Sequence, residues 1–379
     1  MKDIKKIIII PDSFKSTMSS IEVSEIIKSS AESICENVDC ICVPIADGGE
    51  GTVECFSHSI NAKKLTVSVN GPFFESVDAT YLFDEKTKTA VIEAASCAGI
   101  TLAEGRLDPE KTTTFGLGEI IKDAYKNGAK KIVVGLGGSC TNDGGCGMAS
   151  ALGIRFFDEN KTEFIPTGET LSLIKSIDFD SLSSEINKIE IVAMCDVKNP
   201  FYGENGAAHI FAKQKGADDK MIKRLDGGLL HLAKIIEDSK SINLQEIEGT
   251  GAAGGLGGGM IAFLNAKLNS GIETMLDMVN FDEIIKNADL IITGEGNFDS
   301  QSLDGKVING ISSRAKKQNI PVIVVCGGVS DSEIQKAYSQ GVSAVFPITR
   351  QAKDFSITRN FSKEYLKATA DNVFRLLNI

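Results

Sequence analysis

Short runs of apolar, mostly β-branched residues recur along the chain, and several are apolar on consecutive positions. Strands that helices cover on both faces have this pattern, whereas strands with one solvent face alternate. Helical patterns lie between most runs; residues 19–34, for example, carry an apolar stripe behind a serine-rich start. This alternation predicts an α/β protein with a largely parallel sheet. The runs are IIII (7–10), CICVPI (40–45), KLTVSV (64–69), TAVIEA (89–94), KIVVGL (131–136), IEIVAM (189–194), DLIITG (289–294), PVIVVCG (321–327) and SAVFPI (343–348).

The middle of the chain departs from this alternation, because residues 66–95 have the pattern of a three-strand meander. A chain of 379 residues is also too long for one ordinary core. We therefore expect a Rossmann-like, doubly wound parallel-sheet domain built from residues 1–60 and 281–379, with a large α/β domain, residues 61–280, inserted into it. A simple split near the middle is the alternative. An active site is expected in the cleft between the two domains.

Composition excludes several classes of protein. The net charge is −11 and no block of Lys or Arg stands out, which argues against nucleic acid as a partner. The apolar runs are far shorter than a membrane span, and the first residues do not form a signal peptide, so we expect a cytoplasmic protein. The nine cysteines include no CxxC pair and are expected to be reduced, small hydrophobic residues. Three histidines leave little material for a histidine-rich metal site.

Polar, glycine-rich stretches follow five of the expected strands, where an open parallel sheet binds its ligands. Glycines before a helix let backbone N–H groups approach an anion, and lysines add charge. Carboxylates repel phosphate, so carboxylates beside such glycines imply a divalent cation, most simply Mg²⁺. Each stretch alone could be a helix cap or a tight turn, but their co-occurrence favours a site for phosphoryl transfer. The stretches are PDSFK (11–15), ADGGEG (46–51), GGSCTNDGG (137–145), DVKNP (196–200) and GEGNFDSQSLDGK (294–306).

The common nucleotide-binding motifs are weak or missing. GTGAAG (249–254) matches GxGxxG, but no convincing strand precedes it, so dinucleotide binding is a poor interpretation. Two alternatives stay open: a further phosphate or substrate loop, or close packing of the helix that follows. No Walker A motif and no protein-kinase motif occurs in the sequence.

With these stretches assembled, the sequence resembles the type-1 glycerate kinases, the bacterial glycerate 2-kinases, nearly from end to end. The resemblance implies ATP- and Mg²⁺-dependent phosphorylation of D-glycerate to 2-phosphoglycerate by a two-domain α/β protein. The motifs that carry it are PDSFK, PIADGGEGT, LGGSCTNDGGCGM, CDVKNP, QKGA (214–217), GTGAAGGLGGGM and ADLIITGEGNFDSQSLDGK.

The chain departs from the family pattern at a few positions. Ser16 stands where the family often has glycine, and Asn297 where it often has arginine. Before QKGA, Ala212 and Lys213 replace the usual glycine and proline. Without an arginine at 297, a lysine has to stabilise the transferred charge; the candidates are Lys15, Lys198 and Lys306.

The expected site draws on all five stretches and on ATP and Mg²⁺ as cofactors. Asp196 or Asp299 is the expected general base. The catalytic candidates are Asp12, Lys15, Asp47, Asp196, Asp299 and Lys306; the substrate or phosphate contacts are Ser13, Gly48, Gly49, Gly51, Asn199, Gly294, Gly296 and Ser302; the nucleotide contacts are Gly137, Gly138, Ser139, Thr141, Asn142, Asp143, Gly144 and Gly145; and the metal ligands are Glu50 and Glu295.

Glycerate and ATP are the expected partners, with no nucleic acid and no membrane, and a homodimer is left open. Two rival functions remain. One is a kinase for another short hydroxy acid, and the other is a ligand-binding regulator that kept the cleft without catalysis. Magnesium-dependent turnover would separate the second rival from both kinases.

Overall fold

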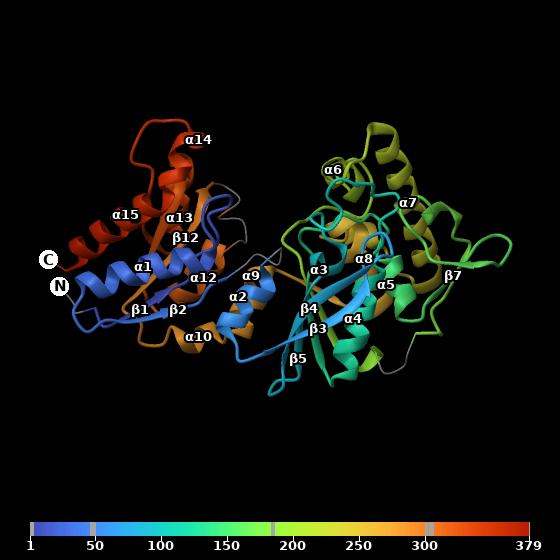
Figure 1. The fold of residues 1–379 in the computed structure, drawn as a ribbon, viewed down its shortest axis with the longest axis horizontal. Coiled ribbons are helices and arrows are strands. Elements are labelled where there is room, and N and C mark those ends of the chain that lie inside the picture. Colours follow the sequence, from blue (N-terminus) through green and yellow to red (C-terminus); the bar gives the residue numbers. More distant parts are fainter. Residues whose placement is uncertain (1–3, 46–50, 183–185, 300–301, 303–306, 379) are drawn as a thin grey trace. The chain divides into compact units, whose positions relative to one another are not determined.

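The computed structural model describes residues 4–45, 51–182, 186–299, 302 and 307–378 (Figure 1). By its contacts the chain divides into two compact units. The first consists of Met1–Asp47, Glu54–Ile60 and Ser270–Ile379, and the second of Gly48–Val53 and Asn61–Asn269. Residues 270–280 thus belong by contact to the first unit, whereas the sequence pattern predicts them in the inserted domain. That these units are independent folding domains stays a prediction.

The first unit contains a five-stranded, entirely parallel sheet in the order β14-β13-β12-β1-β2. Numbered along the sheet's own strands, this is the doubly wound order 2-1-3-4-5. The strand order reverses between β1 and β12, and ligands bind at such a switch point in open α/β sheets. The strands are β1 (Lys6–Ile9), β2 (Asp39–Cys42), β12 (Leu290–Phe298), β13 (Val322–Val329) and β14 (Val342–Pro347).

Helices cover both faces of this sheet, as the consecutive apolar runs predicted. On one face, α1 (Ser20–Ile34) and α15 (Ser362–Leu377) lie side by side and bury Ile9 of β1 (Figure 1). On the other face, α12 (Val307–Lys317) and α13 (Asp331–Ser339) pack against Val324 of β13. Ser19 caps α1 with Glu22 in a capping box, so this helix begins where the sequence indicated. Further helices that the structure describes in this unit include α9 (Gly271–Met278), α10 (Phe281–Ile284), α14 (Phe355–Thr358) and η5 (Arg359–Phe361).

The second unit contains a six-stranded mixed sheet in the order β11-β10-β6-β5-β4-β3. The pairs among β11, β10, β6 and β5 are parallel, and β3 and β4 add an antiparallel edge. This edge confirms the predicted meander. The strands are β3 (Lys63–Asn70), β4 (Ser76–Asp84), β5 (Thr89–Glu93), β6 (Lys131–Gly135), β10 (Glu190–Met194) and β11 (Lys267–Asn269), and a small antiparallel sheet contains β7 (Arg155–Phe157), β8 (Glu163–Phe164) and β9 (Ser176–Asp178).

Helices of the second unit pack on this sheet around one large apolar core. They are α3 (Ala95–Ala98), α4 (Phe115–Lys126), α5 (Cys146–Ala151), α6 (Ala207–Phe211), α7 (Asp219–Lys240) and α8 (Ala252–Leu264), with the 3₁₀ turns η1 (Leu171–Leu173), η2 (Ile186–Lys188), η3 (Lys213–Lys215) and η4 (Leu244–Glu246); α2 (Thr52–Ser59) precedes β3. In the described part of the chain, no helix is both long and apolar enough to cross a membrane.

Strand β12 is longer than its apolar run. The apolar run predicts a strand that ends at Gly294, but pairing with β13 continues to Phe298, with Glu295 opposite Cys326. This pairing requires glycine at position 294. A Cβ there would lie 2.1 Å from the carbonyl oxygen of Val325, which is too close for any other residue. The polar stretch therefore starts inside the sheet, and it presents Glu295 from a rigid strand instead of a loop.

Candidate active site

The ends of β1 and β12 meet at the switch point of the first unit. The backbone N–H of Asp12 donates to the carbonyl of Gly294 at 2.8 Å, and Thr293 Oγ1 donates to the carbonyl of Ile10 at 2.8 Å. A Cβ on Gly296 would lie 3.3 Å from the backbone nitrogen of Lys15, so this glycine keeps the two segments close. The structure thus brings two of the predicted stretches together within one unit.

Hydrogen bonds near the end of β12 position Asp299. The side-chain amide of Asn297 donates to Asp299 Oδ2 at 2.9 Å, and the backbone N–H of Asp299 donates to Ser302 Oγ at 3.0 Å. Ser302 is buried, with 1% of its surface exposed, and its backbone N–H donates back to the carbonyl of Asp299. The hydroxyl of Ser302 therefore holds the backbone N–H of Asp299, and the amide of Asn297 orients its carboxylate.

The loop after β1 contains a residue in an uncommon conformation. Ser16 has φ = 70° and an exposed side chain. Residues other than glycine cost roughly 1–2 kcal/mol in this left-handed region. Glycine would adopt the same conformation freely. In the same loop, the backbone N–H of Ser13 donates to Asp12 Oδ1 at 2.6 Å.

Part of the predicted site cannot be placed. Asp47, Gly48, Gly49, Glu50 and Lys306 lie outside the described residues. Gly51, just before α2, is described; its φ of 91° suits glycine, and nothing lies within 4 Å of an added Cβ.

In the second unit, two further predicted stretches leave neighbouring parallel strands at the same edge. Residues 137–145 follow β6 and residues 196–200 follow β10. In the latter, Asp196 is half-buried and Lys198 is exposed. The side-chain amide of Asn199 donates to the carbonyl of Asn205 at 2.9 Å, so this amide stabilises the loop to which it belongs.

The glycine-rich segment 249–259 supports both of these stretches. The backbone N–H of Gly251 donates to the carbonyl of Asn199 at 3.0 Å, and Gly254 accepts from the backbone N–H of Gly144 at 3.1 Å. Ala253, Gly254 and Gly255 are left-handed in succession, with φ of 53°, 70° and 87°. A Cβ on Gly254 would lie 2.0 Å from the carbonyl oxygen of Thr141. The structure thus favours the close-packing interpretation of the GTGAAG motif.

Asp143 organises the 137–145 loop from inside. Its side chain has no exposed surface and accepts hydrogen bonds from the backbone N–H groups of Thr114, Gly145 and Gly147 and from the hydroxyl of Thr114. Burial raises the pKa of the Asp143 carboxyl, and these donors oppose the rise. Its carboxylate therefore links the loop to the starts of α4 and α5, and its oxygens are already occupied by donors.

The rest of this loop consists of an exposed turn followed by a buried segment. Gly137 and Gly138 form a turn in which Gly138 is exposed and left-handed, with φ = 77°. From Ser139 onward the residues are buried, and Ser139 Oγ lies 2.8 Å from Thr141 Oγ1. The remaining members of the predicted nucleotide set, Asn142, Gly144 and Gly145, are all buried.

Lys215 is a residue of this region that the predicted site did not include. It ends η3, has only 2% of its surface exposed, and donates from Nζ to the carbonyl of Thr141 at 2.7 Å. Burial lowers the pKa of Lys215 to about 8. A lysine in QKGA reads as an ordinary surface residue in a sequence, and only membership of a recognised motif could have drawn attention to it.

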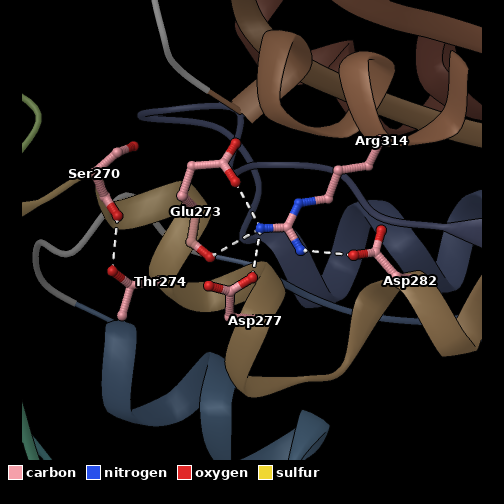
Figure 2. A network of polar contacts seen from close by, with 6 residues as sticks. All are labelled: Ser270, Glu273, Thr274, Asp277, Asp282 and Arg314. Carbon is pink, nitrogen blue, oxygen red and sulfur yellow. Dashed lines mark hydrogen bonds and ion pairs between the residues drawn. The ribbon is translucent and has the colours of Figure 1, made fainter. Parts of the chain in front are cut away.

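An arginine-centred network connects three helices of the first unit (Figure 2). Arg314 of α12 is nearly buried and donates from Nη2 to Glu273 and Asp277, both at 2.6 Å, and from Nη1 to Asp282 at 3.4 Å. Gly310 of α12 also contacts Ile272, because a Cβ there would lie 3.0 Å from that side chain. The network fixes α9 and α10 to α12, the helix that follows residues 294–306.

These features define an α/β protein with a doubly wound parallel sheet and polar, glycine-rich strand ends. The glycerate kinase family model matches residues 7–378, and the chain belongs to this family. It is 42% identical over 369 residues to a glycerate kinase from Bacillus cereus, covering 97% of both chains. It is 41% identical over 345 residues to the glycerate 2-kinase of Escherichia coli, covering 90% of both. A crystal structure from Salmonella typhimurium LT2, named as a glycerate kinase 2, matches with a TM-score of 0.86 at 37% identity and covers 99% of this chain and 98% of the other.

Proposed function

We propose that this chain is an ATP- and Mg²⁺-dependent kinase that phosphorylates D-glycerate to 2-phosphoglycerate in the cytoplasm. Membership of the glycerate kinase family supports the substrate, and similarity to a protein named glycerate 2-kinase supports the product. The observation that carries the proposal is the close approach of the Asp12–Lys15 loop to Gly294 and Gly296 at the switch point. Ligands of open parallel sheets bind in this position.

The residues at the switch point fit a magnesium ion by their chemistry. Within the described ranges, no group of three or more His, Cys, Asp or Glu side chains is placed to hold a metal. Mg²⁺ commonly uses only one or two protein carboxylates and takes its other ligands from phosphate oxygens and water. Asp12, Glu295 and Asp299 would supply such oxygens, as would Glu50 outside the described residues. When bound, Mg²⁺ would neutralise charge on the phosphates.

Phosphoryl transfer needs few groups beyond these. The 2-hydroxyl oxygen of glycerate attacks the γ-phosphorus, ADP leaves, and the hydroxyl proton passes to a carboxylate. Asp299 and Asp196 are the two candidates for this base. The amide of Asn297 orients Asp299 but carries no charge, so Lys15, Lys198 or Lys306 would stabilise the transferred phosphoryl group.

We assign the nucleotide phosphates to the 137–145 loop, through its backbone N–H groups. The saturated carboxylate of Asp143 would then act as the organiser of the loop instead of a ligand contact. Glycine-rich turns suit this role because their backbone can approach an anion closely.

ADP release by the purified protein, with ATP and Mg²⁺, tests the proposal. D-glycerate, L-glycerate, glycolate and no acid are compared, each with and without chelator. Turnover with D-glycerate alone, abolished by chelator, is the expected result. Turnover with another acid would favour the first rival, and ATP binding without any turnover would favour a non-catalytic regulator.

A further inference from the structure

Lys215 places a buried ammonium group against the backbone of the 137–145 loop, at the carbonyl of Thr141. Its Nζ has three N–H donors, and in the described part of the chain the carbonyl of Thr141 is its one hydrogen-bond acceptor. Burying an ammonium group costs several kcal/mol unless its donors are satisfied, on the order of 5 kcal/mol for a single ion. A lysine at the end of a helix normally extends its ammonium group into water. Lys213, in the same turn, is exposed in this way.

Asn142, the next residue after Thr141, carries unused donors. It has no exposed surface, and neither atom of its side-chain amide has a hydrogen-bond partner among the described residues. Over the same residues, the backbone N–H groups of Asn142 and Asp143 donate no hydrogen bond. Buried polar groups are nearly always paired. These donors therefore indicate a partner from outside the chain, and donors beside an ammonium group suit an anion.

One peptide unit connects these two observations. The carbonyl of Thr141 and the N–H of Asn142 belong to the same planar trans peptide, so they point in opposite directions. An ammonium group on the carbonyl side polarises the peptide and makes the N–H a stronger donor. Gly254 closes the carbonyl side further, because a Cβ at that position would lie 2.0 Å from the Thr141 oxygen. The contacts of the Thr141 carbonyl with Lys215 and Gly254 therefore fix the direction of the Asn142 N–H.

We propose that Lys215 is a positioning residue that orients and polarises the Thr141–Asn142 peptide for a phosphate oxygen of the nucleotide. This inference rests on the proposed function. It extends that function because it identifies the Lys215 ammonium as the charged group that supports the 137–145 loop. The ammonium acts through the peptide, and the phosphate contact is the Asn142 N–H.

The charge of Lys215 gives the interaction a pH dependence. Burial lowers its pKa to about 8, and the Cys140 thiol and the Asp143 carboxylate act in the opposite direction. Burial raises the pKa of Cys140 to about 11, so this thiol stays neutral at pH 7–9. Below about pH 8 the ammonium is charged and supports the loop, and above it the support is lost. Nucleotide affinity of the free protein should thus fall as pH rises through this range.

The test uses the full-length protein, with Lys215→Met removing the charge and Lys215→Arg retaining it. Lys213→Met, on the same turn but exposed, is the matched control for loss of one positive charge. Calorimetry gives the Kd of ATP with Mg²⁺, of tripolyphosphate and of D-glycerate from pH 7 to 9.5, and thermal unfolding shows that each variant is folded. For Lys215→Met we expect ATP and tripolyphosphate to bind roughly 10–100-fold more weakly, as for loss of a charge-assisted hydrogen bond. D-glycerate binding and the Lys213→Met protein should stay within about twofold of wild type.

The pH profile separates this role from a purely structural one. The wild-type affinity for ATP should decrease above pH 8, the Lys215→Met affinity should not, and Lys215→Arg should stay tight throughout. A folded Lys215→Met protein with wild-type ATP affinity would overturn the inference and would assign the unused groups to an internal water. If glycerate affinity fell instead of ATP affinity, the nucleotide assignment of the loop would be wrong. If wild type bound no ATP, the proposed function would fail, and the tripolyphosphate series alone would then decide whether the anion site exists.

Discussion

The carboxylate of Asp143 accepts hydrogen bonds from both the backbone N–H and the hydroxyl of Thr114, at 2.7 and 2.8 Å. The two residues belong to different loops, one after β6 and one at the start of α4. Since Asp143 is fully buried, its removal would leave several donors without an acceptor. We expect Asp143→Ala to lower the free energy of unfolding by ~3–5 kcal/mol.

Urea unfolding checks this prediction, with Asp238→Ala on the exposed side of α7 as the control. The control should stay within about 0.5 kcal/mol of wild type. Equal effects of the two substitutions would show that Asp143 does not organise the loop.

Ser16 offers a substitution that should stabilise the chain. Its φ of 70° is unfavourable for serine and free for glycine, although glycine also gains entropy in the unfolded chain. The balance predicts that Ser16→Gly raises the free energy of unfolding by ~0.5–1 kcal/mol. Ser16→Ala, which keeps the Cβ, should give no gain in the same unfolding measurement. A loss of stability on Ser16→Gly would mean that the serine side chain makes a contact worth more than the strain.

The Arg314 network should contribute to stability in a salt-dependent way. Its three carboxylates are half or more exposed, which weakens each pair, but the arginine itself is 10% exposed and serves all three. We expect Arg314→Met to cost ~1–2 kcal/mol at low salt. In 1 M NaCl the difference should shrink, because the Debye length falls to about 3 Å.

Arg314→Lys keeps the charge but not the fork of donors, so it should restore only part of the loss. A cost for Arg314→Met that does not change with salt would assign the effect to packing of α12 on α9 instead of to the ion pairs.

Several features of the fold follow directly from the sequence. The apolar runs predicted the parallel strands, and residues 66–95 predicted the antiparallel edge. The end of β12 was missed, because Glu295 and Asn297 do not look like strand residues, and only pairing with β13 extends the strand to Phe298. A single sequence shows apolar pattern but not the neighbour that pairs with a polar stretch.

The candidate site shows the same limit. The Asp12–Lys15 and 294–299 stretches could be connected in advance because both follow parallel strands. Lys215 could not be found, since burial of its ammonium group depends on packing against Thr141, far away in the chain. Similarly, Asp143 reads as a ligand contact in the sequence, and only its four donors reveal the organising role.

Asp299 provides a test of the catalytic proposal. Asn297 orients its carboxylate and Ser302 holds its backbone N–H, so Asp299→Asn should preserve the fold and lose the charge. If Asp299 is the base or a metal ligand, we expect kcat to fall at least about 100-fold. Glu364→Gln on the exposed face of α15 is the control for loss of one carboxylate, and it should leave kcat unchanged. A kcat for Asp299→Asn within tenfold of wild type would remove Asp299 from both roles.

The most direct measurement is the identity of the product formed from D-glycerate, ATP and Mg²⁺, by phosphorus NMR with coupling to the carbon-bound protons. A phosphate on C2 couples to one proton, and a phosphate on C3 couples to two. The account predicts 2-phosphoglycerate, formed only with the D-isomer and only in the presence of Mg²⁺. Formation of 3-phosphoglycerate, or no phosphorylated acid from a folded protein that binds ATP, would contradict it.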